Sequence, residues 1–82
     1  MRMLDADRDQ SVKHLQLYLT CSEAEYFRKE LDRLLADPEA SDHSHVGGDD
    51  MSREISFSIL TPQKLAAGLN YTQLERKIFG EP

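Results

Sequence analysis

The stretch from Val12 to Ala36 constrains the fold most strongly. An alternating pattern of apolar residues is followed there, without a connecting loop, by apolar residues at helical spacing. Within residues 12–20, three apolar residues alternate with more polar ones: Leu15, Leu17 and Leu19. A period of two is typical of a strand with one buried face and one open face. This segment therefore predicts a β-strand that is half covered by the rest of the protein.

The residues that follow predict an amphipathic helix. Ser22 and Glu25 match a capping box, in which a hydroxyl and a carboxylate satisfy the unpaired amides at a helix start. Apolar residues then recur at helical spacing and form one stripe, made of Ala24, Phe27, Leu31, Leu34 and Leu35. The residue before a proline is steered away from the α-helical region, so the helix is expected to end at Asp37, before Pro38.

A second alternating stretch predicts a β-hairpin in the middle of the chain. The glycine and aspartate residues 47–50 are a turn signal, with a short strand expected at 42–46 and a longer one at 51–60. A turn centred on residues 48 and 49 would place His43 opposite Glu54. Ile55, Phe57 and Ile59 would then share the covered face of the sheet.

Two short helices are predicted near the end of the chain. Thr61 and Pro62 are typical of a helix N-cap followed by proline in the first turn, and Gly68 is expected to end this helix. Thr72 begins a second capping box, and Gly80 is expected to stop the helix that follows.

These elements predict an α+β fold. The expected architecture is a two-layer sandwich in the order β-α-β-β, followed by short C-terminal helices. Its sheet would have about three strands, with one main helix on one face. Residues 1–11 are polar and without periodicity, and they are interpreted as a flexible N-terminal tail. Residues 12–82 are expected to form a single small domain.

The length and net charge of the chain limit the classes of function that it can have. A chain of 82 residues buries a small core, and its single cysteine excludes an intramolecular disulfide. Small domains of this kind often gain stability by oligomerising, so a homodimer is expected. The net charge of −5 disfavours direct binding to nucleic acid. No apolar run reaches membrane-spanning length, and the free thiol favours the cytoplasm.

The open sheet face is the first candidate site, because it would collect every histidine of the protein. His43 and His45 lie two residues apart, and His14 would share their face. With Glu54 or Asp42 they would offer enough ligands for zinc or another divalent metal. The alternative interpretation is that these histidines are simply solvated near a polar turn.

Catalytic interpretations find less support in the sequence. Cys21 precedes the predicted helix, where its thiol pKa could fall, but His14 would lie roughly 20 Å away along a strand. Carboxylate catalysis or calcium binding at the glycine turn lacks a matching motif. A small enzyme with its site at a dimer interface is a further alternative, with His43, Glu54 and Tyr18 as acid–base candidates.

The leading hypothesis is a small intracellular protein-interaction or regulatory module that binds another protein and forms a homodimer. Its acidic surface would suit a basic partner. The expected interface anchors are Tyr18, Leu60 and Phe79, because aromatic and large apolar residues are enriched in such contacts. The alternative is a divalent-metal-binding protein that uses His43, His45 and His14.

Overall fold

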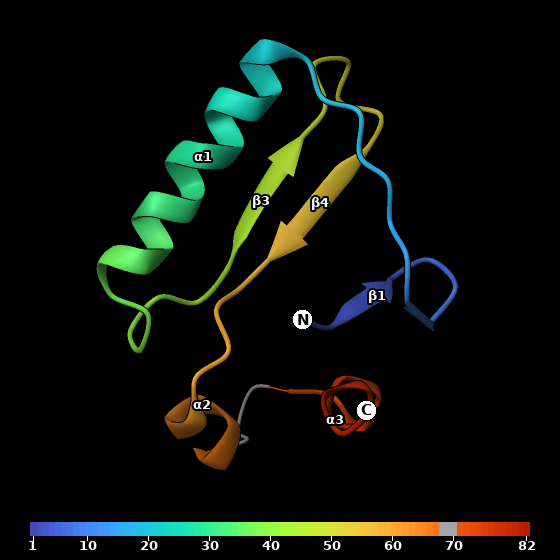
Figure 1. Cartoon of the computed structure of the whole chain (residues 1–82), viewed down its shortest axis with the longest axis vertical. Helices are drawn as coiled ribbons and strands as arrows, with labels where there is room; N and C mark the ends of the chain where they lie inside the picture. The colour runs from blue at the N-terminus through green and yellow to red at the C-terminus, as the bar shows by residue number, and fades with distance from the viewer. Residues whose placement is uncertain (68–70) are drawn as a thin grey trace. The chain divides into compact units, whose positions relative to one another are not determined.

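The computed structural model describes residues 1–67 and 71–82. Within these residues the chain forms a small α+β fold with two two-stranded antiparallel sheets and three helices. The elements belong to two compact units, one made of Met1–Leu17 with residues 68–82 and the other of Tyr18–Ala67. Figure 1 shows the elements of both units.

The N-cap of the main helix, α1 (Cys21–Ala36), is Thr20 and not Ser22. The Thr20 hydroxyl accepts a hydrogen bond from the Glu23 amide, and the Glu23 carboxylate accepts one from the Thr20 amide. The predicted capping box at Ser22 is therefore wrong, because an overlapping match two residues earlier forms the cap. The helix ends at the C-cap Asp37, which confirms the predicted stop before proline.

The central hairpin consists of β3 (Ser44–Gly47) and β4 (Glu54–Phe57). His45 lies opposite Ser56, and Gly47 lies opposite Glu54. The predicted register, which placed His43 opposite Glu54, is wrong by four residues. Because a shift of four is even, the side chains stay on the predicted faces.

The register differs because the connection between the strands is longer than the predicted turn. The Gly48 amide donates to the Arg53 carbonyl, and the Met51 amide donates to the Gly48 carbonyl, at 2.8 Å each. Met51 has a positive φ of 62°, which closes this loop in a conformation that L residues seldom adopt. The loop therefore spans residues 48–53 and keeps these residues out of the strands.

Helix α1 packs on one face of the β3–β4 hairpin (Figure 1). Leu34 and Val46 are buried between the two layers. The rings of Phe27 and Phe57 stack with their centroids 4.6 Å apart. A hairpin alone is marginally stable, so the helix supplies the apolar cover that this one requires.

The predicted strand at residues 12–20 is not formed. No strand is assigned from Lys13 to Thr20, and the predicted three-stranded sheet is therefore wrong among the described residues. Leu15, Leu17 and Leu19 keep 45–48% of their surface exposed. The alternating pattern places side chains on two faces of an extended segment. A strand also needs a neighbouring strand for its backbone hydrogen bonds, and the pattern does not specify one.

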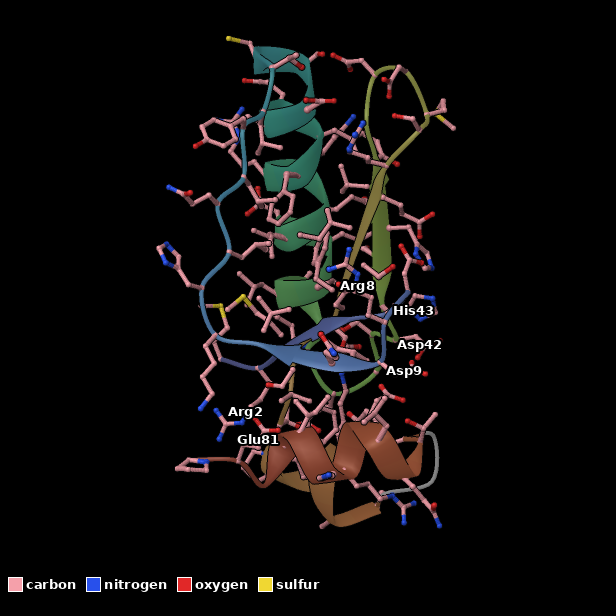
Figure 2. All side chains as sticks on the ribbon, turned by 90° about the vertical axis from the view of Figure 1, so that its right-hand side faces the viewer. Arg2, Arg8, Asp9, Asp42, His43 and Glu81 are labelled. Carbon is pink, nitrogen blue, oxygen red and sulfur yellow. The ribbon has the colours of Figure 1, made fainter. Side chains whose placement is uncertain are left out.

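The unit that contains the chain's N-terminus holds a second hairpin, β1 (Met3–Asp5) and β2 (Gln10–Val12). The hairpin, including the turn between its strands, covers most of the segment that the sequence predicts to be a tail. The Arg2 guanidinium donates to the Glu81 backbone carbonyl, and the Ser11 hydroxyl donates to the Glu81 carboxylate at 2.8 Å. Figure 2 shows Arg2 and Glu81 next to each other.

The two short helices, α2 (Pro62–Ala67) and α3 (Gln73–Phe79), confirm the predicted starts. The Lys64 amide donates to the Thr61 hydroxyl, and Thr72 forms the predicted capping box. Gly80 is the C-cap of α3, whereas the predicted stop at Gly68 lies outside the described residues. None of the helices in residues 1–67 and 71–82 is long and apolar enough to cross a membrane.

Candidate functional site

The exposed face of the β3–β4 hairpin carries a cluster of polar side chains centred on His45. Its Nδ1 atom lies 2.5 Å from Oε1 of Glu54 and 2.6 Å from the Ser56 hydroxyl. The Ser56 hydroxyl donates to the same Glu54 oxygen at 3.2 Å. Glu54 is the diagonal neighbour of His45 across the hairpin, which is within reach of a long side chain.

His43 extends this cluster beyond the start of β3. Its Nδ1 atom lies 3.2 Å from Oδ2 of Asp42, and its ring meets the ring of His45 edge-to-face with centroids 4.6 Å apart. Figure 2 shows Asp42 and His43 together at this end of the hairpin. We call the surface formed by His43, His45, Glu54 and Ser56 the open face.

A carboxylate lies beside the Nδ1 atom of each imidazole. A carboxylate only accepts hydrogen bonds, so a protonated Nδ1 is the form of the ring that suits this contact. In the neutral ring the other nitrogen, Nε2, is then free to donate a lone pair. About half of the His43 and His45 side-chain surface is exposed, so solvent or a bound species can reach these rings.

This arrangement can bind a cation, because imidazole nitrogens and carboxylate oxygens are ligands of divalent metals. In metal sites the ligating histidine usually donates its second ring N–H to a carboxylate. Asp42 and Glu54 lie beside Nδ1 of His43 and His45, as such supporting carboxylates do, and their use as direct ligands stays a prediction. Within the described residues no three His, Cys, Asp or Glu side chains are grouped to hold one metal ion.

The other predicted site residues lie apart from the open face or are not placed against it. His14 belongs to the unit of Met1–Leu17 and residues 68–82, so its role as a third ligand stays a prediction. Glu54 contacts His45 and not His43, and the predicted acid–base use of His43 with Glu54 gains no support from this contact. Cys21 is exposed in the first turn of α1.

The three predicted interface residues differ in exposure. Tyr18 is 86% exposed and Leu60 is 37% exposed. Phe79 packs edge-to-face against Tyr71 with centroids 4.9 Å apart and is half-buried. Tyr18 therefore offers more free surface than the other two residues.

Sequence reasoning missed the contact between the 48–53 loop and the start of α1. The Asp49 carboxylate accepts hydrogen bonds from the Thr20 hydroxyl at 2.7 Å and the Ser22 hydroxyl at 3.1 Å. The Asp49 amide donates to the Glu23 carboxylate at 2.7 Å. A cluster of hydroxyl residues before a helix, together with an acidic turn, is the signal that could have indicated it.

Asp50 in the same loop has a lowered pKa. The backbone amide of Ser52 donates to its carboxylate at 3.0 Å and is the largest cause, and the Ser52 hydroxyl adds a second hydrogen bond at 2.7 Å. Hydrogen bonds to the charged form favour that form. Asp50 thus stabilises the loop conformation as a carboxylate.

Comparison with known proteins gives no family for this chain: no protein-family model, no curated protein and no solved structure matches it. The function must therefore be argued from the open face and its surroundings.

Proposed function

We propose that this protein is a small cytoplasmic interaction module that forms a homodimer through the open face and binds another protein. The single observation that carries the proposal is the one-sided cover of the β3–β4 hairpin. Helix α1 packs on one face, whereas His45, Glu54 and Ser56 on the other face are exposed.

The small core supports self-association. Among the described residues only Leu34, Val46 and Ile78 are buried apolar side chains. Many large apolar residues remain exposed, including Leu15, Leu17, Tyr18, Leu19, Tyr26, Leu35 and Leu65. A domain with so little buried surface gains stability from a partner, because association removes further surface from water.

The strand edges and the charge support partner binding. A two-stranded sheet offers two edges, and an unpaired edge is a template for another chain. The net charge of −5 favours encounter with a basic protein partner. Tyr18, Leu60 and Phe79 are not part of the open face and are proposed as further interface anchors. Tyr18 is the most exposed of them.

Native mass spectrometry over a concentration series in the presence of a chelator tests the homodimer. The proposal predicts a dimer, and Ser56→Arg in the middle of the open face is expected to dissociate it. Gln63→Arg adds the same charge on α2 and should leave the dimer intact. A wild-type protein that is monomeric at every concentration would refute the proposal. Equal effects of Ser56→Arg and Gln63→Arg on the dimer would also refute it, provided that both variants keep the circular dichroism spectrum of the wild type.

A divalent-metal-binding protein is the second candidate. The observation that favours it is the pair of carboxylate–histidine contacts, Asp42 with His43 and Glu54 with His45. Zinc would be expected to raise the melting temperature of the wild-type protein. The same rise in a variant that lacks both histidines would exclude this candidate.

A further inference from the structure

We propose that the homodimer binds one tetrahedral transition-metal ion between its two open faces, through His43 and His45 of each copy. This inference rests on the proposed homodimer and adds a ligand to it. Zinc is the expected metal class, because imidazole nitrogens suit it and four ligands satisfy its preferred geometry.

The orientation of the two imidazoles suits metal binding. Nδ1 of His45 faces Glu54, and Nδ1 of His43 faces Asp42. When Nδ1 carries the proton in this contact, Nε2 is the nitrogen that offers its lone pair to a metal ion. A carboxylate behind each histidine is the usual outer shell of a zinc site.

The distance between the two rings suits a shared metal ion. With zinc–nitrogen bonds of about 2.0–2.1 Å and a tetrahedral angle, two imidazoles on one ion have centroids roughly 5 Å apart. The centroids of His43 and His45 are 4.6 Å apart. The two exposed rings are therefore close enough to share one ion once both Nε2 atoms turn toward it.

The number of available ligands requires a second copy of the chain. Asp42 and Glu54 are already engaged by the Nδ1 atoms, and the described residues group no third ligand with the two histidines. One copy therefore supplies two nitrogens to the site. A second copy related by a two-fold axis supplies the same two, since a symmetric dimer places identical patches against each other.

The charges of the carboxylates couple metal binding to dimerisation. Dimerisation through the open face would bring Glu54 and Asp42 of one copy toward the same carboxylates of the other. Like charges that face each other across an interface oppose association. A divalent cation between them would offset this repulsion, so metal binding and dimerisation are expected to strengthen each other.

Titration with Co²⁺ of chelator-treated, full-length protein tests the proposal, because the visible absorption of Co²⁺ reports its coordination geometry. The expected result is an intense tetrahedral spectrum that saturates at one metal per two chains and is displaced by zinc. The double variant His43→Gln, His45→Gln should lose the spectrum and remain a dimer in chelator. The matched control His14→Gln should bind Co²⁺ as the wild type does.

The other possible results of the Co²⁺ titration distinguish failure of the metal site from failure of the homodimer. A dimer in chelator that gives no tetrahedral spectrum overturns the metal site and leaves the proposed homodimer standing. A monomer that binds one metal per chain overturns both. Loss of binding in His14→Gln overturns the four-histidine site in favour of one that uses His14.

A measurement on the wild type keeps the test valid if the double variant does not fold. Zinc is expected to shift the ring-proton NMR signals of His43 and His45 and to leave those of His14 unchanged. Equal shifts for all histidines, or none, would overturn the proposal.

Glu54 is a positioning residue in this site. Glu54→Gln keeps the side-chain length but weakens the contact with Nδ1 of His45, so Co²⁺ affinity should fall by about 10- to 100-fold. If Glu54 has only a structural role, Glu54→Gln should lower the melting temperature in chelator and leave the Co²⁺ affinity unchanged. That result would refute the positioning role.

Discussion

The Asp49 carboxylate accepts a hydrogen bond from the Thr20 hydroxyl at 2.7 Å, and it thereby joins the 48–53 loop to the first turn of α1. The same hydroxyl accepts from the Glu23 amide, so one side chain caps the helix and holds the loop. A negative charge at a helix N-terminus is also favoured by the helix dipole. This contact fixes one end of the hairpin that carries the open face.

Replacing Asp49 with alanine is expected to lower the free energy of unfolding by about 1 kcal/mol, because hydrogen bonds and a favourable charge at the helix start are lost. Asp32→Ala, on the exposed surface of α1, is the matched control and should change stability by less than about 0.5 kcal/mol. Urea unfolding followed by circular dichroism measures both. Equal stabilities of the two variants would show that the loop contact contributes nothing.

The pKa of Asp50 is expected to lie below the ordinary aspartate value of about 3.9 in the folded protein. The amide and hydroxyl of Ser52 favour the carboxylate, so its contribution to stability is present above the unfolded-state pKa and is lost as pH falls through the folded-state pKa. Carbon-detected NMR titration measures this pKa directly. Ser52→Ala removes the hydroxyl and should raise the Asp50 pKa part of the way back. A wild-type pKa at or above the ordinary value would contradict this account.

Substituting glycine for Met51 is expected to stabilise the protein. Met51 has a φ of 62° and is 84% exposed, so little packing is lost with its side chain. The left-handed conformation costs an L residue about 1–2 kcal/mol, and glycine loses about 0.5–1 kcal/mol in unfolded-chain entropy, which leaves a net gain of about 0.5 kcal/mol. Thermal unfolding should show a higher melting temperature for Met51→Gly and a lower one for Ser52→Gly. A lower melting temperature for Met51→Gly would contradict the proposed strain.

Tyr18→Ser is expected to weaken the homodimer by about tenfold or more, because exposed aromatic residues dominate many interfaces. The monomer's stability should change little, since this side chain is 86% exposed. Tyr26→Ser, on α1 and 50% exposed, is the matched control. Sedimentation equilibrium gives both dissociation constants. If both substitutions leave self-association unchanged, Tyr18 is not an interface anchor.

Local patterns predicted α1, its end before Pro38 and the separation of faces on the β3–β4 hairpin. These features depend on neighbouring residues in the sequence, through capping, proline geometry and side-chain alternation. The alternating pattern predicted that His45 and Glu54 share one face of the hairpin. This is confirmed although the predicted register is wrong, because the error is an even number of residues. The open face could therefore be predicted without knowing the pairing.

The remaining features depend on tertiary contacts that no local pattern specifies. Leu15, Leu17 and Leu19 alternate as a strand does, but no paired strand forms at these residues. The N-cap is Thr20 and not Ser22 because Thr20 and Glu23 form an overlapping capping box, while the Ser22 hydroxyl donates to Asp49 from a distant loop. The carboxylate contacts of His43 and His45 likewise follow from side-chain positions that a sequence does not reveal.

The central claim is that two copies of the chain meet through the open face. Isotope-filtered NMR on a mixture of labelled and unlabelled protein in chelator tests it most directly, because the filter retains only contacts between different copies. The account predicts intermolecular signals from the protons of His45 and Ser56. Intermolecular signals confined to the outer surface of α1, or none at concentrations where the protein is fully associated, would contradict it.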